Sequence, residues 1–102
     1  MDPRELKDLA WIGDAVLALY AREWLLEQPQ NPLFTRQELF LRFTRNDFLQ
    51  AIAEPTKVEA AIGAIYRKEG LEAAFAHIES TLQPLFRKHL LNATKGRKGQ
   101  KR

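Results

Sequence analysis

The sequence predicts an all-α fold of about five to six helices, and three observations support this. Apolar residues recur at three- and four-residue spacing through most of the chain. Residues that favour helix starts and stops separate these segments. No stretch alternates convincingly between apolar and polar residues, and no Asn-Gly or Asp-Gly pair marks a hairpin. The 102 residues, 45% of them hydrophobic, suffice for one compact domain.

The first helix is predicted to run from Pro3 to about residues 27–28. Asp2 can cap it, Pro3 suits its first position, and Glu5 lies three residues after the cap. The turn-rich stretch 29–32 (PQNP) then ends it.

Two short helices are predicted next. Thr35 and Glu38 have the spacing of a capping box and open a helix through about Phe43. Thr44 and Asp47 offer the same cap chemistry for a helix that carries Phe48, Leu49 and Ile52.

The C-terminal half holds the remaining predicted helices. Pro55 suits the start of one helix, and Gly70 suits its end. The next begins near Leu71, and Pro84 marks a break or kink before a last apolar segment. From residue 92 onward the chain is polar and basic. We therefore expect a helical domain over residues 1–93 and a disordered basic tail over residues 94–102.

Composition excludes several kinds of site. The chain has no cysteine, so it has no disulfides, thiolate metal sites or cysteine nucleophiles. Its two histidines are too few and too isolated to suggest a zinc site. The N-terminus lacks the apolar core of a signal peptide, and no apolar run approaches the ~20 residues that span a bilayer. We expect a soluble protein, located by default in the cytoplasm.

Charge is unevenly distributed along the chain. The formal net charge is +3, from 16 Lys and Arg against 13 Asp and Glu. Residues 95–102 (KGRKGQKR) carry five basic residues and no acid, so residues 1–94 hold 11 basic against 13 acidic residues, a net of −2. A basic tail is most often a solubilising or nonspecific electrostatic arm, and specific reading of RNA is the less common role.

Two acids stand in apolar helical segments. Asp14 is the only charged residue between positions 9 and 20, and Gly13 precedes it. Glu59 has a similar apolar setting, with Gly63 four residues later. A lone carboxylate is costly to bury without a cation, strong donors or a raised pKa. We predict that the two helices cross at their glycines and turn both carboxylates toward one pocket, where they hold a divalent metal.

Hard oxygen ligands without nearby histidine or cysteine favour Mg²⁺, with Mn²⁺ as the alternative. Such an ion can activate a water as nucleophile and stabilise a phosphate oxygen, which suggests phosphodiester hydrolysis.

The residues alone leave other readings open. Each acid can instead be salt-bridged, with Lys7, Arg22 or Arg67 as the partner, and the glycines can be simple packing sites. Four phenylalanines are expected to belong to the core or to an interface rather than to a base-stacking platform: Phe34, Phe40, Phe43 and Phe48.

The two acidic segments resemble the two signature segments of the ribonuclease III catalytic domain. Residues 9–17 (LAWIGDAVL) are similar to that family's apolar–Gly-Asp-Ala-Val helix. Residues 58–66 (VEAAIGAIY), with 70–74 (GLEAA), are similar to its second acidic helix and the turn after it. Asn46 stands where the family often has an asparagine that opens a helix. The resemblance covers about residues 5–80. It is closest to the short Mini-ribonuclease III branch, since we expect no double-stranded-RNA-binding domain to follow.

The resemblance implies an all-α endonuclease domain that forms a two-fold homodimer and cleaves double-stranded or structured RNA with Mg²⁺. Its expected partner is a ribosomal RNA precursor or the ribosome, in ribosomal RNA maturation. It also implies that Asp14 and Glu59 are catalytic residues and metal ligands. The candidate RNA-binding residues are the cations Arg36, Arg42, Arg45, Lys57, Lys95, Arg97, Lys98, Lys101 and Arg102.

The chain departs from the family pattern near both acids. Classical members carry further acids at the positions of Lys7, Ala10 and Thr56, and the short branch is also non-acidic at the last two. Only 45 positions separate Asp14 from Glu59, which is a shorter interval than in active members. An alternative is therefore a catalytically degenerate relative that binds RNA or the ribosome without cutting. A helical interaction protein unrelated to RNA is the third reading.

Overall fold

The computed structural model describes residues 2–99, with side chains through residue 95. Its helices are α1 (Pro3–Glu27), α2 (Arg36–Thr44), α3 (Asn46–Gln50), α4 (Pro55–Glu69), α5 (Leu71–Thr81) and α6 (Gln83–Gly99). The described residues contain no strand, so the predicted all-α class and the number of helices are confirmed. None of the described helices combines the length and apolar composition needed to cross a membrane.

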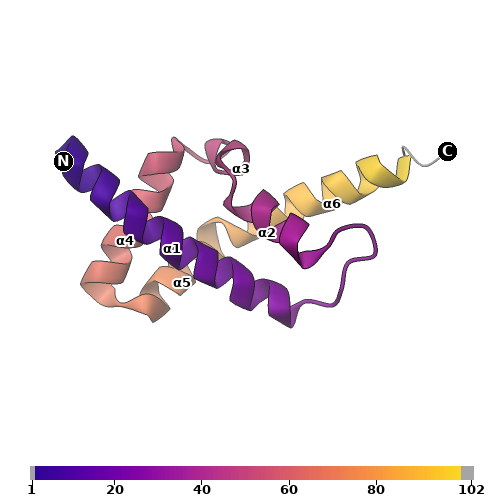
Figure 1. Cartoon of the computed structure of the whole chain (residues 1–102), viewed down its shortest axis with the longest axis horizontal. Coiled ribbons are helices and arrows are strands. Elements are labelled where there is room, and N and C mark those ends of the chain that lie inside the picture. The colour runs from indigo at the N-terminus through magenta and orange to yellow at the C-terminus, as the bar shows by residue number, and fades with distance from the viewer. Residues whose placement is uncertain (1, 100–102) are drawn as a thin grey trace.

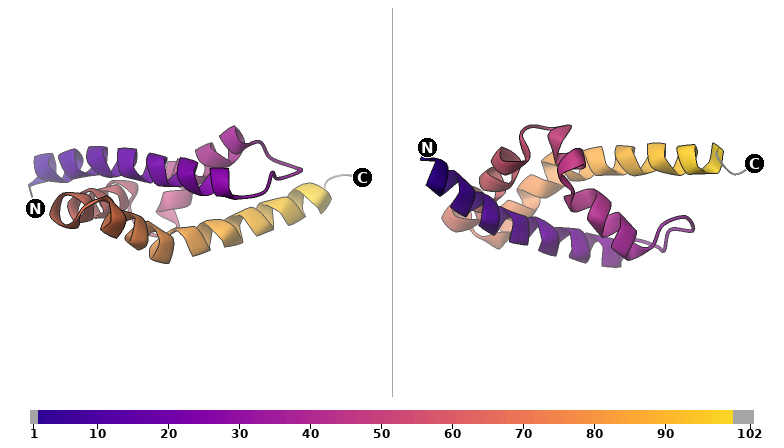
Figure 2. Two further views of the ribbon diagram at one scale, coloured as in Figure 1. Left: turned by 90° about the horizontal axis from the view of Figure 1, so that it is seen from below. Right: turned by 45° about the horizontal axis from the view of Figure 1, so that its top comes forward.

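The helices are arranged in two layers. The long helix α1 passes over α4 and α5, and α6 continues from α5 toward the opposite end of the molecule (Figure 1). Seen from below, α1 forms one layer and the run from α4 to α6 forms the other (Figure 2). The molecule is elongated, with extents of 52 × 25 × 20 Å. The N-terminal end of α1 and the C-terminal end of α6 therefore lie at opposite ends of its long axis.

Aromatic side chains from both layers fill the centre of the core. The rings of Phe43 and Phe86 stack with centroids 4.3 Å apart, and neither side chain is exposed. Trp24 and Phe48 meet these rings edge-on. The four predicted core phenylalanines are accordingly buried or half-buried: Phe34, Phe40, Phe43 and Phe48.

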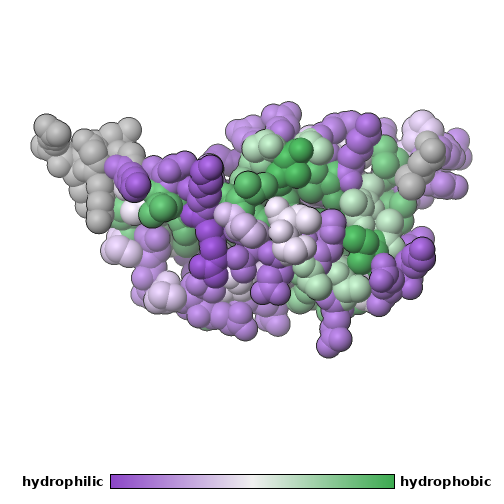
Figure 3. Space-filling view, turned by 180° about the vertical axis from the view of Figure 1, so that it is seen from behind, coloured by the Kyte–Doolittle hydropathy of each residue, from purple (hydrophilic) through white to green (hydrophobic). Residues whose placement is uncertain are grey.

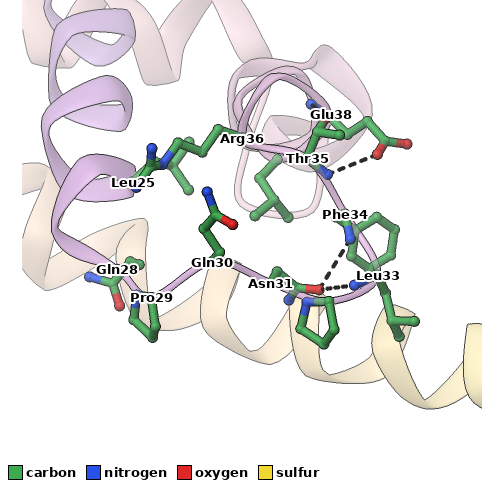
Figure 4. A pocket seen from close by; sticks show the side chains of 12 residues that line it. Leu25, Gln28, Pro29, Gln30, Asn31, Leu33, Phe34, Thr35, Arg36 and Glu38 are labelled. Atoms are coloured by element: carbon green, nitrogen blue, oxygen red, sulfur yellow. Dashed lines mark hydrogen bonds between the residues drawn. The ribbon is translucent and has the colours of Figure 1, made fainter.

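Two of the predicted helix caps are confirmed. The Asp2 carboxylate accepts a hydrogen bond of 3.1 Å from the Arg4 N–H at the start of α1. At α2, the Glu38 N–H donates to the Thr35 hydroxyl at 3.1 Å, and the Thr35 N–H donates to the Glu38 carboxylate at 2.9 Å. Figure 4 shows this cap beside Asn31, whose side-chain oxygen accepts hydrogen bonds from two backbone N–H groups and turns the chain from α1 into α2.

The predicted cap at Thr44 is wrong. Thr44 is the last residue of α2, and its hydroxyl donates a hydrogen bond of 2.9 Å to the Phe40 carbonyl one turn earlier. Asn46 is instead the first residue of α3, and Arg45 before it makes no side-chain cap. The hydroxyl therefore closes one helix rather than opening the next.

The later boundaries follow the predicted signals, except at the C-terminus. Gly70 ends α4 with φ at 98°, and a break at Leu82 separates α5 from α6. However, α6 continues to Gly99, past the boundary expected at residue 93. The expected disorder of residues 94–102 stays a prediction, and residues 100–102 lie outside the described chain. Ala93 packs against the core, and lysine and arginine are good helix formers, which favours continued helix.

Glycines allow α1 and α4 to cross in backbone contact, as predicted. A Cβ placed on Gly13 would lie 2.6 Å from the carbonyl carbon of Glu59. A Cβ on Gly63 would lie 2.9 Å from the carbonyl carbon of Leu9 and 3.1 Å from the Gly13 nitrogen. Each glycine thus faces the residue that precedes the other glycine by one helical turn.

Gly13→Ala and Gly63→Ala are each expected to lower the free energy of unfolding by about 3 kcal/mol. Replacing glycine by alanine in a helix ordinarily stabilises by about 1 kcal/mol, so the sign should reverse here. The added methyl group meets backbone, which cannot rotate away as a flexible side chain can. Urea unfolding followed by circular dichroism measures the change. Ala61→Ser, at an exposed position of α4, is the control, and equal or greater stability of the glycine variants would contradict the crossing.

Candidate functional site

The helix crossing brings the carboxyl groups of Asp14 and Glu59 within hydrogen-bonding reach of each other. Asp14 directly follows Gly13, the glycine that packs on the Glu59 peptide. The Asp14 side chain is exposed, and that of Glu59 is half-buried. The predicted meeting of the two acids is confirmed, while the pocket predicted around them and their binding of a metal stay predictions.

The surroundings of Glu59 oppose its negative charge. Burial, and then the neighbouring Asp14, raise the pKa of Glu59 to about 7. No cation appears among the causes of this shift, although a salt bridge was the alternative expectation. One suggested partner, Arg22, instead places its guanidinium 4.2 Å from the centroid of the Phe40 ring. The burial of Glu59 and the negative charge of Asp14 therefore both oppose ionisation of Glu59.

The donor set at this pair fits a hard divalent cation. Carboxylate oxygens are preferred ligands of Mg²⁺, which also keeps several waters in its shell. Ala10 and Thr56, one turn before Asp14 and Glu59 respectively, add no carboxylate. Within the described residues, no group of three or more His, Cys, Asp or Glu gathers at one place. An ion held by the pair would thus take its remaining ligands from water or substrate oxygens.

The predicted RNA-binding residues are spread over the molecule. Lys57 is exposed in the first turn of α4, two residues before Glu59. Arg36 lines a hollow beneath the loop between α1 and α2 (Figure 4). Arg42 and Arg45 line a second hollow together, and Lys95 is exposed near the end of α6. Four predicted contacts have side chains outside the described part: Arg97, Lys98, Lys101 and Arg102.

Sequence reasoning missed two residues that share the hollow of Arg42 and Arg45. These are Lys88 and His89 of α6. No helical spacing connects positions 42–45 with 88–89, and only the packing of α6 against the core brings them together. The sequence offered one signal for this hollow: Arg42 and Lys88 each lie within two residues of a phenylalanine, so packing of those phenylalanines could bring the two cations together.

Comparison with known proteins finds no match, whether to a family model, a curated protein or a solved structure. The resemblance to the ribonuclease III domain therefore stays an expectation based on the two acidic segments. The functional interpretation depends on the residues and on their geometry.

The metal-free protein is expected to lose stability as the pH rises from about 5 to about 8, in part because of Glu59. Its pKa is raised from 4.5 to about 7 in the folded state. The folded state thus keeps a proton that the unfolded state releases, so this stabilisation is complete below pH 4.5 and is lost as the pH rises through 7. Thermal unfolding in EDTA gives the Tm of wild type and of Glu59→Gln at each pH. The difference between the two Tm values should change by a few degrees between about pH 5 and about pH 8, on the order expected for a small domain.

His89 contributes the opposite trend, because burial lowers its pKa and its stabilising effect is lost as the pH falls. It is present in both proteins, so the comparison between them removes its contribution. Glu69→Gln, at an exposed position of the same helix, is the matched control. A Tm difference between wild type and Glu59→Gln that stays constant with pH would contradict the raised pKa.

Proposed function

We propose that the protein is a metal-dependent endoribonuclease that cleaves structured, double-stranded RNA. The observation that carries this proposal is the meeting of the Asp14 and Glu59 carboxyl groups at the helix crossing, where the Asp14 side chain is exposed to solvent. The all-helical order and the resemblance of both acidic segments to the ribonuclease III domain support the same activity. A ribosomal RNA precursor is the proposed substrate on the strength of that resemblance.

The chemistry proposed for the pair is hydrolysis of a phosphodiester. A divalent ion supplies, when bound, a lowered pKa for water and stabilisation of negative charge on phosphate oxygens. In the reaction a water oxygen bonds to phosphorus, one ester P–O bond breaks, and the leaving oxygen takes up a proton. Asp14 is exposed and so accessible to an RNA phosphate, whereas Glu59 is held by the backbone contact at Gly13. That contact fixes the main chain from which the Glu59 side chain projects, which favours a defined geometry.

A noncatalytic RNA- or ribosome-binding protein is the second candidate. It is favoured by the lack, within the described residues, of a third acid beside the pair. The presence of Glu59 at a place that disfavours its charge, beside Asp14, argues for the enzyme, because a purely structural crossing has no need of either carboxylate.

We also propose that two copies associate through an apolar face centred on α1. Trp11 has 80% of its surface exposed and Leu19 has 43%, and with Ala15 they recur every four residues along one side of the helix. A shallow groove beside them is completed by Tyr66 of α4 and Leu71 of α5. Other apolar patches reach the surface on the side seen in Figure 3. A two-fold dimer requires one self-complementary patch, and a widely exposed tryptophan is a suitable anchor.

Asp14→Asn and Glu59→Gln are each expected to reduce cleavage of a labelled RNA duplex by at least about a hundredfold, since each removes a charged ligand. The assay compares product formation in Mg²⁺, in Mn²⁺ and in EDTA, and EDTA should abolish it. Glu23→Gln on α1 and Glu69→Gln on α4 are matched controls at exposed positions, and both should cleave at the wild-type rate. Duplex that is bound but left intact in every metal-containing reaction would refute the enzyme and favour the binding protein.

Trp11→Ala is expected to raise the dissociation constant of the dimer by about thirtyfold, as for a hot-spot residue worth about 2 kcal/mol. Sedimentation equilibrium should show the wild type at twice the monomer mass of 11.8 kDa and the variant near the monomer mass at the same concentration. Leu91→Ala is the control, because Leu91 is 56% exposed and lies on α6, a helix that contributes no residue to the proposed face. A monomeric wild type, or equal association of all three proteins, would refute this face.

A further inference from the structure

A cationic hollow lies where α2, α3 and α6 meet, in a different part of the molecule from the acid pair. Its volume is about 390 Å³. Arg42, Arg45, Lys88 and His89 line it, with Asp47 as the only carboxylate of the lining. Three cations against one carboxylate give a net charge of +2 with His89 neutral. This positive charge stands out because residues 1–94 as a whole carry a net charge of −2.

Core side chains hold two of these polar groups in place. The Arg42 guanidinium lies 4.6 Å from the centroid of the Phe34 ring. The His89 imidazole lies against two rings, with centroid distances of 5.7 Å to Phe48 and 6.1 Å to Phe86. Because these rings belong to the buried aromatic core, the guanidinium and the imidazole are positioned before any ligand arrives.

The positive field extends to the imidazole. Burial, and then the charges of Arg42 and Arg45, lower the pKa of His89, so its ring is neutral at neutral pH and can donate one hydrogen bond. Arg45 and Lys88 are exposed and can reach a ligand without any rearrangement of the protein core. Lys95 lies seven residues after Lys88 and so continues the basic face along α6.

We propose that the cationic hollow binds a backbone phosphate of RNA. Arg42, Arg45 and Lys88 supply its positive charges, and His89 supplies a hydrogen-bond donor. The apolar part of the lining, Phe48, Ala51 and Leu85, suits the sugar that adjoins a phosphate. This inference rests on the proposed function for its choice of RNA, since inorganic phosphate and free nucleotides offer the same anionic chemistry. A convergent set of cations of this kind contributes salt-dependent affinity and fixes the register of the bound strand.

The test measures binding of a labelled RNA duplex by fluorescence anisotropy, in EDTA so that no strand is cut. The variant Arg45→Gln/Lys88→Gln removes two exposed charges. We expect its RNA affinity to fall about tenfold or more, and the slope of log K against log salt to decrease by about 2, at about 0.9 for each lost phosphate contact. The control Arg4→Gln/Lys68→Gln loses the same net charge at exposed positions outside the hollow, and its affinity should change less than twofold.

Further measurements distinguish a specific loss of the hollow from a general loss of positive charge and from unfolding of the variant. Lys88→Arg should keep the wild-type affinity, and circular dichroism should show every variant folded. Inorganic phosphate and a nucleoside monophosphate serve as competitors. Equal loss of affinity in the two double variants would overturn the inference. So would binding of the small anions in the hollow with RNA affinity left unchanged by Arg45→Gln/Lys88→Gln.

The outcomes also distinguish this inference from the proposed function. RNA that is bound through the hollow but never cut in Mg²⁺ leaves the phosphate site standing and removes the endonuclease. RNA that wild type and Arg45→Gln/Lys88→Gln cut with the same KM keeps the endonuclease and overturns the hollow. A wild-type protein that binds no RNA overturns both.

Discussion

The helices α1 and α4 touch backbone to backbone because each has a glycine at the point where they cross. Gly13 lies on the Glu59 peptide and Gly63 lies on the Leu9 peptide, so the two turns interlock. Any side chain at either glycine would meet main-chain atoms and push the helices apart. This contact sets the distance between the Asp14 and Glu59 carboxyl groups. Asp14 directly follows Gly13 in the chain, and Gly13 packs on the Glu59 peptide.

The same contact creates the electrostatic character of the pair. Close packing removes water from Glu59, and the facing Asp14 adds like charge, so both effects raise the pKa of Glu59. In the absence of an ion, this repulsion opposes folding at neutral pH. A bound cation would relieve it, which would couple the stability of the crossing to the occupancy of the site. Strain of this kind is common where a protein keeps a function at some cost to its stability.

A second set of contacts, the aromatic core, builds the other end of the molecule. Phe43 of α2 and Phe86 of α6 stack at its centre, and Phe48 of α3 meets both. This packing brings the cations of α2 and of α6 to one hollow and orients His89 against the rings. The elongated molecule thus has an acidic pair formed by glycine contacts and a cationic hollow formed by aromatic contacts.

Local chemistry in the sequence determined the helical class, most helix boundaries and the crossing itself. Thr35, Pro55 and Gly70 each determine a helix end through interactions within their own turn. A glycine beside a single acid in an apolar helix is a sequence signal, readable locally, for close approach of another backbone. Tertiary packing decided what these signals leave open. The Thr44 hydroxyl had two possible partners, and only the extent of α2 selected the Phe40 carbonyl. Likewise, Lys88 and His89 lie beside Arg42 and Arg45 in one hollow. The stacking of Phe86 on Phe43 brings these segments together, and no periodic pattern in the sequence predicts a contact between residues so far apart in the chain.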